Sequence, residues 1–257
     1  MAAAVAGQTR HRRIVTQHFN ALGQPVGFPL PDWTAPPRPP RTTLTGRYCR
    51  VEPLDAQRHP TELHTANRLD PSGRAFTYLA AGPFDSLDSY LKWINTSCLS
   101  PDPLFHAIID GDSGKALGVA AYMRIDLANG VIEVGHLNFS PLLQQTRVAT
   151  EAMHLMMKNA FALGYRRYEW KCDSLNAPSQ AAARRLGFSY EGRFIQAITY
   201  KGRNRDTDWF SITDREWPAL RAAHEQWLAP ENFDGEGRQR LSLSALTALL
   251  LRAADKQ

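Results

Sequence analysis

The sequence predicts an α+β fold: one mixed, mostly antiparallel sheet with helices on both faces. Two observations carry this prediction. Short apolar or alternating stretches recur through the middle of the chain between turn residues, a pattern typical of strands. Between several of them, apolar residues recur at spacings of three and four, which indicates helices. A chain of 257 residues with 43% hydrophobic content can bury a full core.

The first elements follow residue 43. We expect a strand over 44–54, helices over 55–69 and 85–98, and strands over 103–109 and 116–125 around a Gly111-Asp112 turn. Because a tight turn joins neighbouring antiparallel strands, the last two are expected to pair.

The second half alternates strands and helices. A strand is expected over 130–139, a helix over 147–163, a strand at YEWKCD, and a short helix over 177–186. A hairpin over 188–213, turning at 201–204, closes the sheet. One apolar face marks the long helix, which stops at Gly164; its members are Val148, Ala152, Leu155, Met156, Ala160 and Leu163.

Composition divides the chain into three regions: a basic, proline-rich arm over 1–42, a domain over 43–217 and a helical extension over 218–257. Prolines cluster in 25–40 and favour an extended strap, which Phe28, Leu30 and Trp33 could pin to the body. Two apolar helix faces follow in the extension and require a partner surface, either the same domain or a dimer contact. Their members are Trp217, Leu220 and Trp227, and Leu243, Leu246, Leu249 and Leu250.

Charge is concentrated in the arm. Residues 1–46 hold five arginines and one aspartate, a net of +4 out of +5 for the chain, so the body is not a basic platform for nucleic acid. The run Arg10-His11-Arg12-Arg13 is compatible with RNA, with acidic lipid, with a transit peptide or with a solvated tail, and we favour the tail.

Other sequence features indicate a reduced, cytoplasmic protein without a membrane span. No apolar run approaches the roughly 18 residues of a membrane helix. Cys49, Cys98 and Cys172 are far apart and are expected to be buried packing residues. The eight histidines show no H-E-x-x-H pattern and no pairing with cysteines, so no metal site is expected.

The most informative stretch is 131–192. It holds Glu133 and Gly135 on a strand, Gln144 and the run Ala149-Thr150-Glu151-Ala152 at a helix start, and then an N-x-x-S turn at Asn176 and Ser179, Leu186-Gly187-Phe188 and Glu191-Gly192. In this order, these residues resemble the GNAT superfamily of N-acetyltransferases, and within it the RimJ/RimL-like branch. The resemblance covers roughly residues 43–217.

The resemblance implies acetyl-CoA as co-substrate, an amine acceptor and no metal. A loop that enters a helix N-terminus presents unpaired N–H groups and the positive end of the helix dipole, which can hold the CoA diphosphate. The expected cofactor-binding residues are Asn138, Phe139, Gln144, Thr146, Arg147, Val148, Ala149, Thr150, Asn176 and Ser179.

Glu133 is the candidate general base, because a carboxylate interrupts the apolar run of VIEV, where burial would raise its proton affinity. The alternative is a strand glutamate that meets a lysine or water. Ala183 stands where many relatives have a tyrosine acid, so the resemblance suggests Ser179 as the acid for the leaving thiolate. Ser179 could equally be a first-turn serine, and Asn176 a helix cap.

The diphosphate loop departs from the family pattern Q/R-x-x-G-x-G/A, because Arg147 stands at the first glycine. The arginine could adopt an ordinary helical conformation, project away from the phosphates, or pair with them. A further alternative is a domain that has lost cofactor binding.

We therefore expect an acetyl-CoA-dependent N-acetyltransferase. Its acceptor is expected to be a small amine, an amino acid or an amine-bearing antibiotic, with the proline-rich strap as a lid over it. A protein N-terminal acetyltransferase and a non-catalytic CoA-binding or RNA-associated module are the alternatives. His136, beside Glu133, is the second candidate for proton transfer.

Overall fold

The computed structural model describes residues 17–252. The chain divides into two compact units, Met1–Thr34 and Ala35–Gln257. The described part of the first unit holds a small antiparallel hairpin of β1 (His18–Phe19) and β2 (Pro25–Val26). The basic run of residues 10–13 lies outside the described residues.

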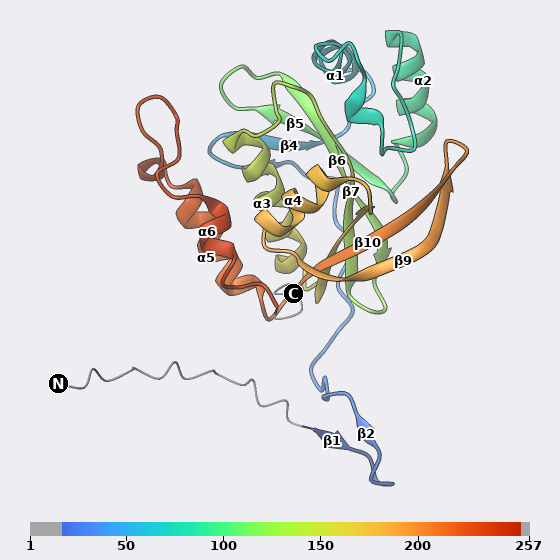
Figure 1. Cartoon of the computed structure of the whole chain (residues 1–257), viewed down its shortest axis with the longest axis vertical. Helices are drawn as coiled ribbons and strands as arrows, with labels where there is room; N and C mark the ends of the chain where they lie inside the picture. Colours follow the sequence, from blue (N-terminus) through green and yellow to red (C-terminus); the bar gives the residue numbers. More distant parts are fainter. Residues whose placement is uncertain (1–16, 253–257) are drawn as a thin grey trace, which may run out of the picture. The chain divides into compact units, whose positions relative to one another are not determined.

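An eight-stranded sheet forms the centre of the second unit, in the order β3-β4-β5-β6-β7-β8-β10-β9 (Figure 1). Only β7 and β8 pair in parallel, so the prediction of a mixed, mostly antiparallel sheet is confirmed. Its strands are β3 (Leu44–Thr45), β4 (Cys49–Pro53), β5 (Leu104–Asp110), β6 (Ala116–Asp126), β7 (Val131–Phe139), β8 (Arg167–Asp173), β9 (Ser189–Tyr200) and β10 (Arg203–Thr213).

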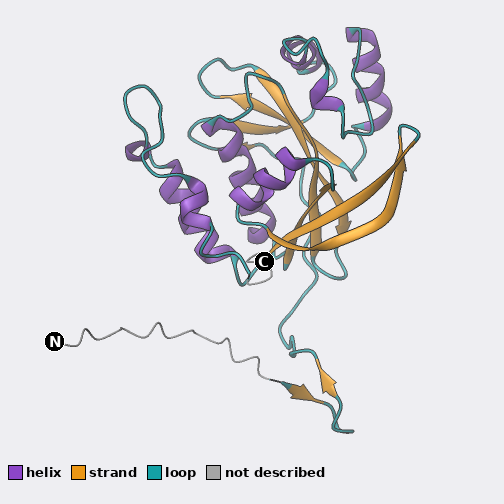
Figure 2. Cartoon of the chain, in the orientation of Figure 1, coloured by secondary structure: helices purple, strands orange, loops and turns teal. Residues whose placement is uncertain are grey.

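Helices cover both faces of this sheet (Figure 2). The α1–α2 face is covered by α1 (Pro60–Asn67) and α2 (Leu87–Ser97). The α3 face is covered by α3 (Arg147–Ala162), α4 (Ala177–Arg185), α5 (Trp217–Leu228) and α6 (Leu243–Thr247). Successive residues of β5 enter different cores, because strand side chains alternate: Leu104 and Ile108 face α3, and Phe105 and Ala107 face α2.

Two expected elements at the start of the domain differ from the structure. The strand expected over 44–54 is broken into β3 and β4, because the Glu151 carboxylate accepts from the N–H groups of residues 47, 48 and 49. A Cβ on Gly46 would lie 2.4 Å from that carboxylate, so the strand breaks where a glycine permits close approach.

The helix expected over 55–69 begins only at Pro60. The Asp55 carboxylate instead accepts from the N–H groups of Gln57 and Arg58, and this turn precedes the helix. The 3-10 turn η1 (Arg74–Phe76) follows α1.

The predicted C-terminal helices fold back on the same domain. Trp217, Leu220, Trp227 and Leu243 are buried in the core on the α3 face, whereas Leu249 stays exposed. Between α5 and α6 lies the 3-10 turn η2 (Pro230–Asn232). Cys49, Cys98 and Cys172 are buried and unbridged, as expected, and burial raises the pKa of each thiol.

The second half of the proline-rich segment lies within the second unit. The Tyr165 hydroxyl donates to Pro37 O at 3.1 Å, and Arg41 donates to Leu54 O at 3.2 Å. Within residues 17–252, no helix is long and apolar enough to cross a membrane.

Candidate active site

The parallel strands β7 and β8 separate part-way along their length. They pair from Val131 with Arg167 to Val134 with Trp170, and the register then ends, while β7 continues to pair with β6. A register shift at this point places His136 in the left-handed region, at φ +50. Asn138 follows on the separated part of β7, 4% exposed, and its Nδ2 meets no hydrogen-bond partner among the described residues. The gap therefore offers a buried amide donor to a ligand.

The loop from β7 to α3 is held by its own side chains. Gln144 Nε2 donates to Phe139 O at 2.8 Å, and Thr146 Oγ1 donates to Leu143 O at 2.7 Å. The same hydroxyl caps α3 by accepting from Ala149 N at 3.1 Å. The N–H groups of Arg147 and Val148 lie in the first turn, where no helical carbonyl can bond them. This terminus can therefore bind a diphosphate.

The Arg147 side chain packs on two aromatic rings. Its guanidinium carbon lies 4.5 Å from the centre of the Tyr48 ring and 5.9 Å from that of Phe233. Arg147 begins α3 in an ordinary helical conformation. Tyr48 in turn donates to Leu228 O at 3.1 Å. Arg147 thus connects the loop before α3 to the segment before β4 and to the C-terminal extension.

A second arginine makes a parallel contact. Arg185, at the end of α4, donates to Thr150 Oγ1 at 3.1 Å and lies 5.0 Å from the centre of the Trp227 ring. Trp227 packs edge-on against Phe233 at 5.2 Å. The first turns of α3 are therefore supported by the extension as well as by the sheet.

Glu133 lies in a buried ion-pair network. Glu133 is 3% exposed. Arg124 Nη1 donates to both oxygens of its carboxylate, at 2.9 and 2.8 Å. Lys171 Nζ lies 2.9 Å from the same carboxylate. Lys171 also lies 2.7 Å from Glu169 Oε2 and 3.6 Å from the centre of the Trp209 ring. Glu133 thus meets a lysine, as the alternative interpretation expected, at a position just before the strands separate. Its catalytic role stays a prediction.

Ser179 and Asn176 lie at the start of α4. Asn176 caps the helix by accepting from Ser179 N at 3.2 Å, and Ser179 Oγ accepts from Trp170 Nε1 at 3.0 Å. Asn176 therefore caps α4, and Ser179 joins α4 to β8. Their expected contacts with the cofactor or the thiolate stay predictions.

His136 belongs to the α1–α2 face. Its ring lies 4.9 Å from that of Phe105, and burial, together with Arg124, lowers its pKa, so the imidazole is neutral at physiological pH. It lines a narrow cavity with Asn138, Phe76, Phe84 and Trp93.

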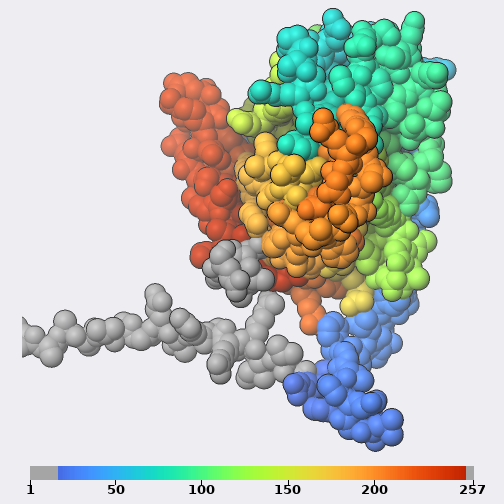
Figure 3. All heavy atoms as spheres, turned by 45° about the vertical axis from the view of Figure 1, so that its right-hand side comes forward, coloured from blue at the N-terminus to red at the C-terminus, as the bar shows by residue number. Residues whose placement is uncertain are grey.

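The segment between α1 and α2 closes over this side. Lys201 Nζ, in the β9–β10 turn, donates to Phe76 O at 2.8 Å, and the Tyr78 hydroxyl donates to Leu175 O at 3.1 Å. Figure 3 shows the β9–β10 hairpin against the segment around α1 and α2.

Several residues of the site were missed from the sequence. Arg124 and Lys171 neutralise Glu133, and the alternation of Glu169, Lys171 and Asp173 along β8 was the one signal that could have found Lys171. Tyr48 and Phe233 carry no such signal, because they are distant from Arg147 in the chain. In the part of the chain that the structure describes, no cluster of His, Cys, Asp or Glu is arranged to hold a metal ion.

Comparisons with known proteins agree with this geometry. The family model of the acetyltransferase (GNAT) domain matches residues 57–189. No curated protein matches the sequence. A GCN5-related N-acetyltransferase from Brucella melitensis is 48% identical, covers 85% of this chain and 100% of its own, and superposes with a TM-score of 0.83.

Two further solved structures are similar. A probable acetyltransferase of the GNAT family from Chromobacterium violaceum is 43% identical over 76% of this chain and 98% of its own, with a TM-score of 0.71. The microcin C7 self-immunity acetyltransferase MccE, solved with acetyl-CoA and AMP, is 21% identical over 65% of this chain and 93% of its own; its TM-score of 0.58 shows a shared fold. The separated parallel strands, the capped helix start and these matches lead to one conclusion: the chain belongs to the GNAT acetyltransferase family.

Proposed function

We propose that the protein transfers an acetyl group from acetyl-CoA to a primary amine of a small molecule. The observation that carries this proposal is the separation of β7 and β8 beyond Val134 and Trp170, with the N-terminus of α3 at one side and the His136 cavity at the other. This arrangement gives a thioester and an amine separate approaches to one gap. The proposal includes the RimJ/RimL-like assignment, in which Asn176 and Ser179 contact acetyl-CoA and Ser179 protonates the leaving thiolate.

The residues present fit acetyl-CoA. The first-turn N–H groups of Arg147 and Val148 suit the diphosphate, and the buried Asn138 amide suits a carbonyl of the pantetheine arm. When bound, acetyl-CoA supplies the activated acyl group. The chain then has to orient the amine, accept its proton and exclude water.

Proton acceptance is assigned to Glu133, directly or through water. Its position next to the gap supports this assignment, and Arg124 and Lys171 hold the carboxylate in one orientation. His136 is the second candidate, because a neutral imidazole lines the cavity beside the gap.

A small acceptor is favoured because the acceptor side is narrow. The contacts of Lys201 with Phe76 and of Tyr78 with Leu175 join the α1–α2 segment to the strands and turns beyond the gap. A protein N-terminus requires an open groove, whereas a small amine suits an enclosed cavity. The predicted lid role of residues 25–40 stays a prediction.

The test combines binding with turnover. Acetyl-CoA at about 100 times its dissociation constant should stabilise the protein by about 2.7 kcal/mol in thermal unfolding. Release of CoA thiol should depend on added primary amine. Asn138→Ala removes one proposed contact with acetyl-CoA, so it should weaken acetyl-CoA binding without unfolding the domain. Absence of both stabilisation and amine-dependent thiol release would reject the proposed function.

A further inference from the structure

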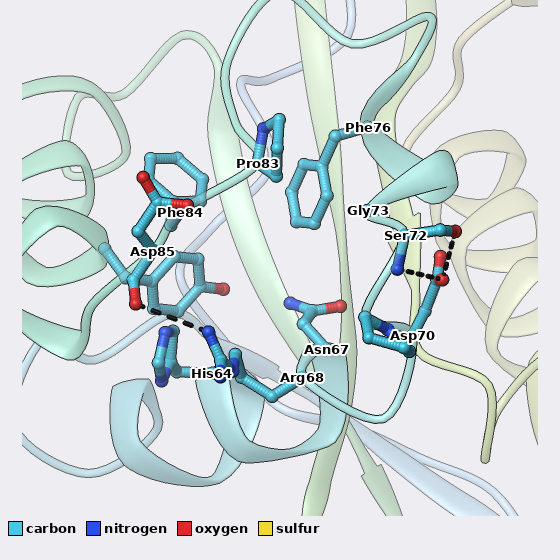
Figure 4. Close-up of a pocket in the computed structure, with 12 residues that line it drawn as sticks. His64, Asn67, Arg68, Asp70, Ser72, Gly73, Phe76, Pro83, Phe84 and Asp85 are labelled. Atoms are coloured by element: carbon cyan, nitrogen blue, oxygen red, sulfur yellow. Dashed lines mark hydrogen bonds between the residues drawn. The ribbon is translucent and has the colours of Figure 1, made fainter.

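A cavity of about 150 Å³ lies between the end of α1, the loop through η1 and the start of α2 (Figure 4). In the close-up, the Asn67 amide and the Phe76 ring face each other across it, and His64 and Arg68 line it from α1. Pro83, Phe84 and Tyr90 complete the aromatic and apolar part of the wall. None of these residues has a role in the site described above, except Phe76 and Phe84.

Two buried polar atoms at this cavity are unsatisfied. Tyr90 is 1% exposed, and its hydroxyl has no hydrogen-bond partner among the described residues; the same holds for His64 Nε2. The two rings lie 5.9 Å apart. An unpaired buried polar group is costly, and most such groups in folded proteins find a partner. Burial raises the pKa of Tyr90, so its neutral hydroxyl can both donate and accept.

The cavity adjoins the reaction site. Phe76 and Phe84 line both this cavity and the narrow one that contains His136 and Asn138, and their rings pack edge to face at 5.7 Å. Phe76 is seated against Gly82, where a Cβ would lie 2.3 Å from the ring carbon Cδ1. The pair therefore separates an outer cavity from an inner one that leads to the gap between β7 and β8.

Size and charge restrict what the outer cavity can hold. A cavity of about 150 Å³ accommodates a single six-membered ring such as benzene, the size of this one. Two charged groups of the lining are hydrogen-bonded within the chain: Arg68 Nη1 donates to the backbone carbonyl of Asp85, and Asp70 Oδ1 accepts from the backbone and side chain of Ser72. The aromatic walls suit a planar ring, and the unpaired atoms suit an uncharged hydrogen-bonding group on it.

We propose that this cavity binds the distal ring of the acceptor, a primary amine whose other end is a small uncharged ring with a hydroxyl or ring nitrogen that bonds Tyr90 and His64. The amine end then points toward Phe76 and Phe84, and these two rings have to part to admit it to the inner cavity beside His136 and Asn138. This inference rests on the proposed function and names its substrate class. Tyr90 and His64 act in it as specificity residues.

The test compares tyramine with phenethylamine, which differ only by the ring hydroxyl. The wild-type protein should acetylate tyramine with at least a 10-fold higher kcat/KM. Tyr90→Phe removes one oxygen from a buried ring and keeps its shape, so it should reduce this ratio to near one by lowering the tyramine value, with phenethylamine unchanged. Tyr122→Phe is the matched control, because its equally buried hydroxyl bonds Met156 O on the α3 face, and it should leave the ratio intact.

A calorimetric titration of tyramine in the presence of CoA gives a second readout that needs no chemistry, and Tyr90→Phe should weaken this binding at least 5-fold. Equal ratios in the wild type and Tyr90→Phe, or acetylation of other amines only, would overturn the inference and leave the proposed function standing. If no amine releases CoA thiol and acetyl-CoA does not bind, the proposed function fails instead.

Discussion

The N-terminal end of α3 and the cavity beside α2 differ in how their buried polar groups are hydrogen-bonded. At α3, the Glu151 carboxylate accepts three backbone N–H bonds, and Thr146 and Gln144 each bond the loop they belong to. Beside α2, the hydroxyl of Tyr90 and the Nε2 of His64 meet no partner among the described residues. At α3, these polar groups find their hydrogen-bond partners within the chain. Beside α2, the two atoms are left to bond a ligand.

This difference matches the demands of the two ligands in the proposed reaction. A cofactor common to the whole family can be bound by a preformed loop, and preorganisation lowers the entropic cost of binding. An acceptor must be distinguished from similar molecules, and unpaired buried polar groups discriminate strongly because they stay unpaired with the wrong ligand.

Among the expected effects, the largest is the loss of folding stability at acidic pH, which originates on the α3 face. His106, His154 and His224 are buried there, and burial lowers the pKa of each to about 4. The unfolded chain binds these protons near pH 6.5, so stability is fully present above that pH and is lost as pH falls toward 4, by about 3 kcal/mol per histidine.

Chemical unfolding at several pH values measures this loss. His154→Phe keeps a ring against Trp217 and His224 and should remove about one-third of the pH dependence that the three histidines contribute. Equal slopes for the wild type and the variant between pH 6.5 and 4 would show that His154 does not stay neutral in the fold.

Glu133→Gln should lower kcat by about 100-fold with acetyl-CoA binding little changed, because the amide keeps the shape but cannot accept a proton. The matched control is Glu169→Gln, since Glu169 stands opposite Glu133 in the register and shares Lys171, but pairs with Arg167 instead of Arg124. Single-turnover kinetics separate the chemical step from binding.

If both variants lose the same activity, the carboxylates serve only to balance Lys171. In that case, His136→Gln becomes the decisive variant, because His136 lines the inner cavity. Unchanged turnover in Glu133→Gln would remove Glu133 from proton transfer.

Local patterns predicted most of the sheet and α3 because their apolar residues recur with a regular period, and they predicted the closing hairpin from its turn at Lys201 and Gly202. They failed over 44–54, where Glu151 breaks the strand from about a hundred residues away, and at Asp55, where a side chain stabilises a turn before the helix. Long-range hydrogen bonds and local capping override propensity in these two places.

The loop that enters the N-terminus of α3 could be anticipated from the apolar period of the helix, and the binding of a diphosphate there stays a prediction. The rings of Tyr48 and Phe233 that pack on Arg147, and the cation Arg124 beside Glu133, come from separate elements, so spacing could not predict them. The cavity of Tyr90 and His64 lies beside the irregular segment between α1 and α2. Apolar residues do not recur regularly there, so the sequence pattern could not predict the cavity.

Arg147→Ala and Phe233→Leu sharpen the account of the diphosphate loop. If the arginine acts by packing on Tyr48 and Phe233, both variants should raise the KM for acetyl-CoA by a similar factor of about 3 to 10, the scale of one lost cation–π contact. Steady-state kinetics at low and high salt provide the measurement. A larger loss in Arg147→Ala that shrinks with salt would instead assign the arginine to the phosphates.

The last comparison concerns two buried tyrosines, each 1% exposed. The Tyr122 hydroxyl donates to Met156 O at 2.7 Å and accepts from Asn159 Nδ2 at 3.3 Å, whereas the Tyr90 hydroxyl has no partner among the described residues. Removing a bonded hydroxyl leaves Met156 O and Asn159 unsatisfied, so Tyr122→Phe should destabilise the domain by about 1–2 kcal/mol in urea unfolding. Tyr90→Phe removes an unsatisfied group and should leave stability unchanged or raise it by about 1 kcal/mol. A comparable loss in both variants would mean that the Tyr90 hydroxyl is satisfied in solution, and the contrast between the two regions would then disappear.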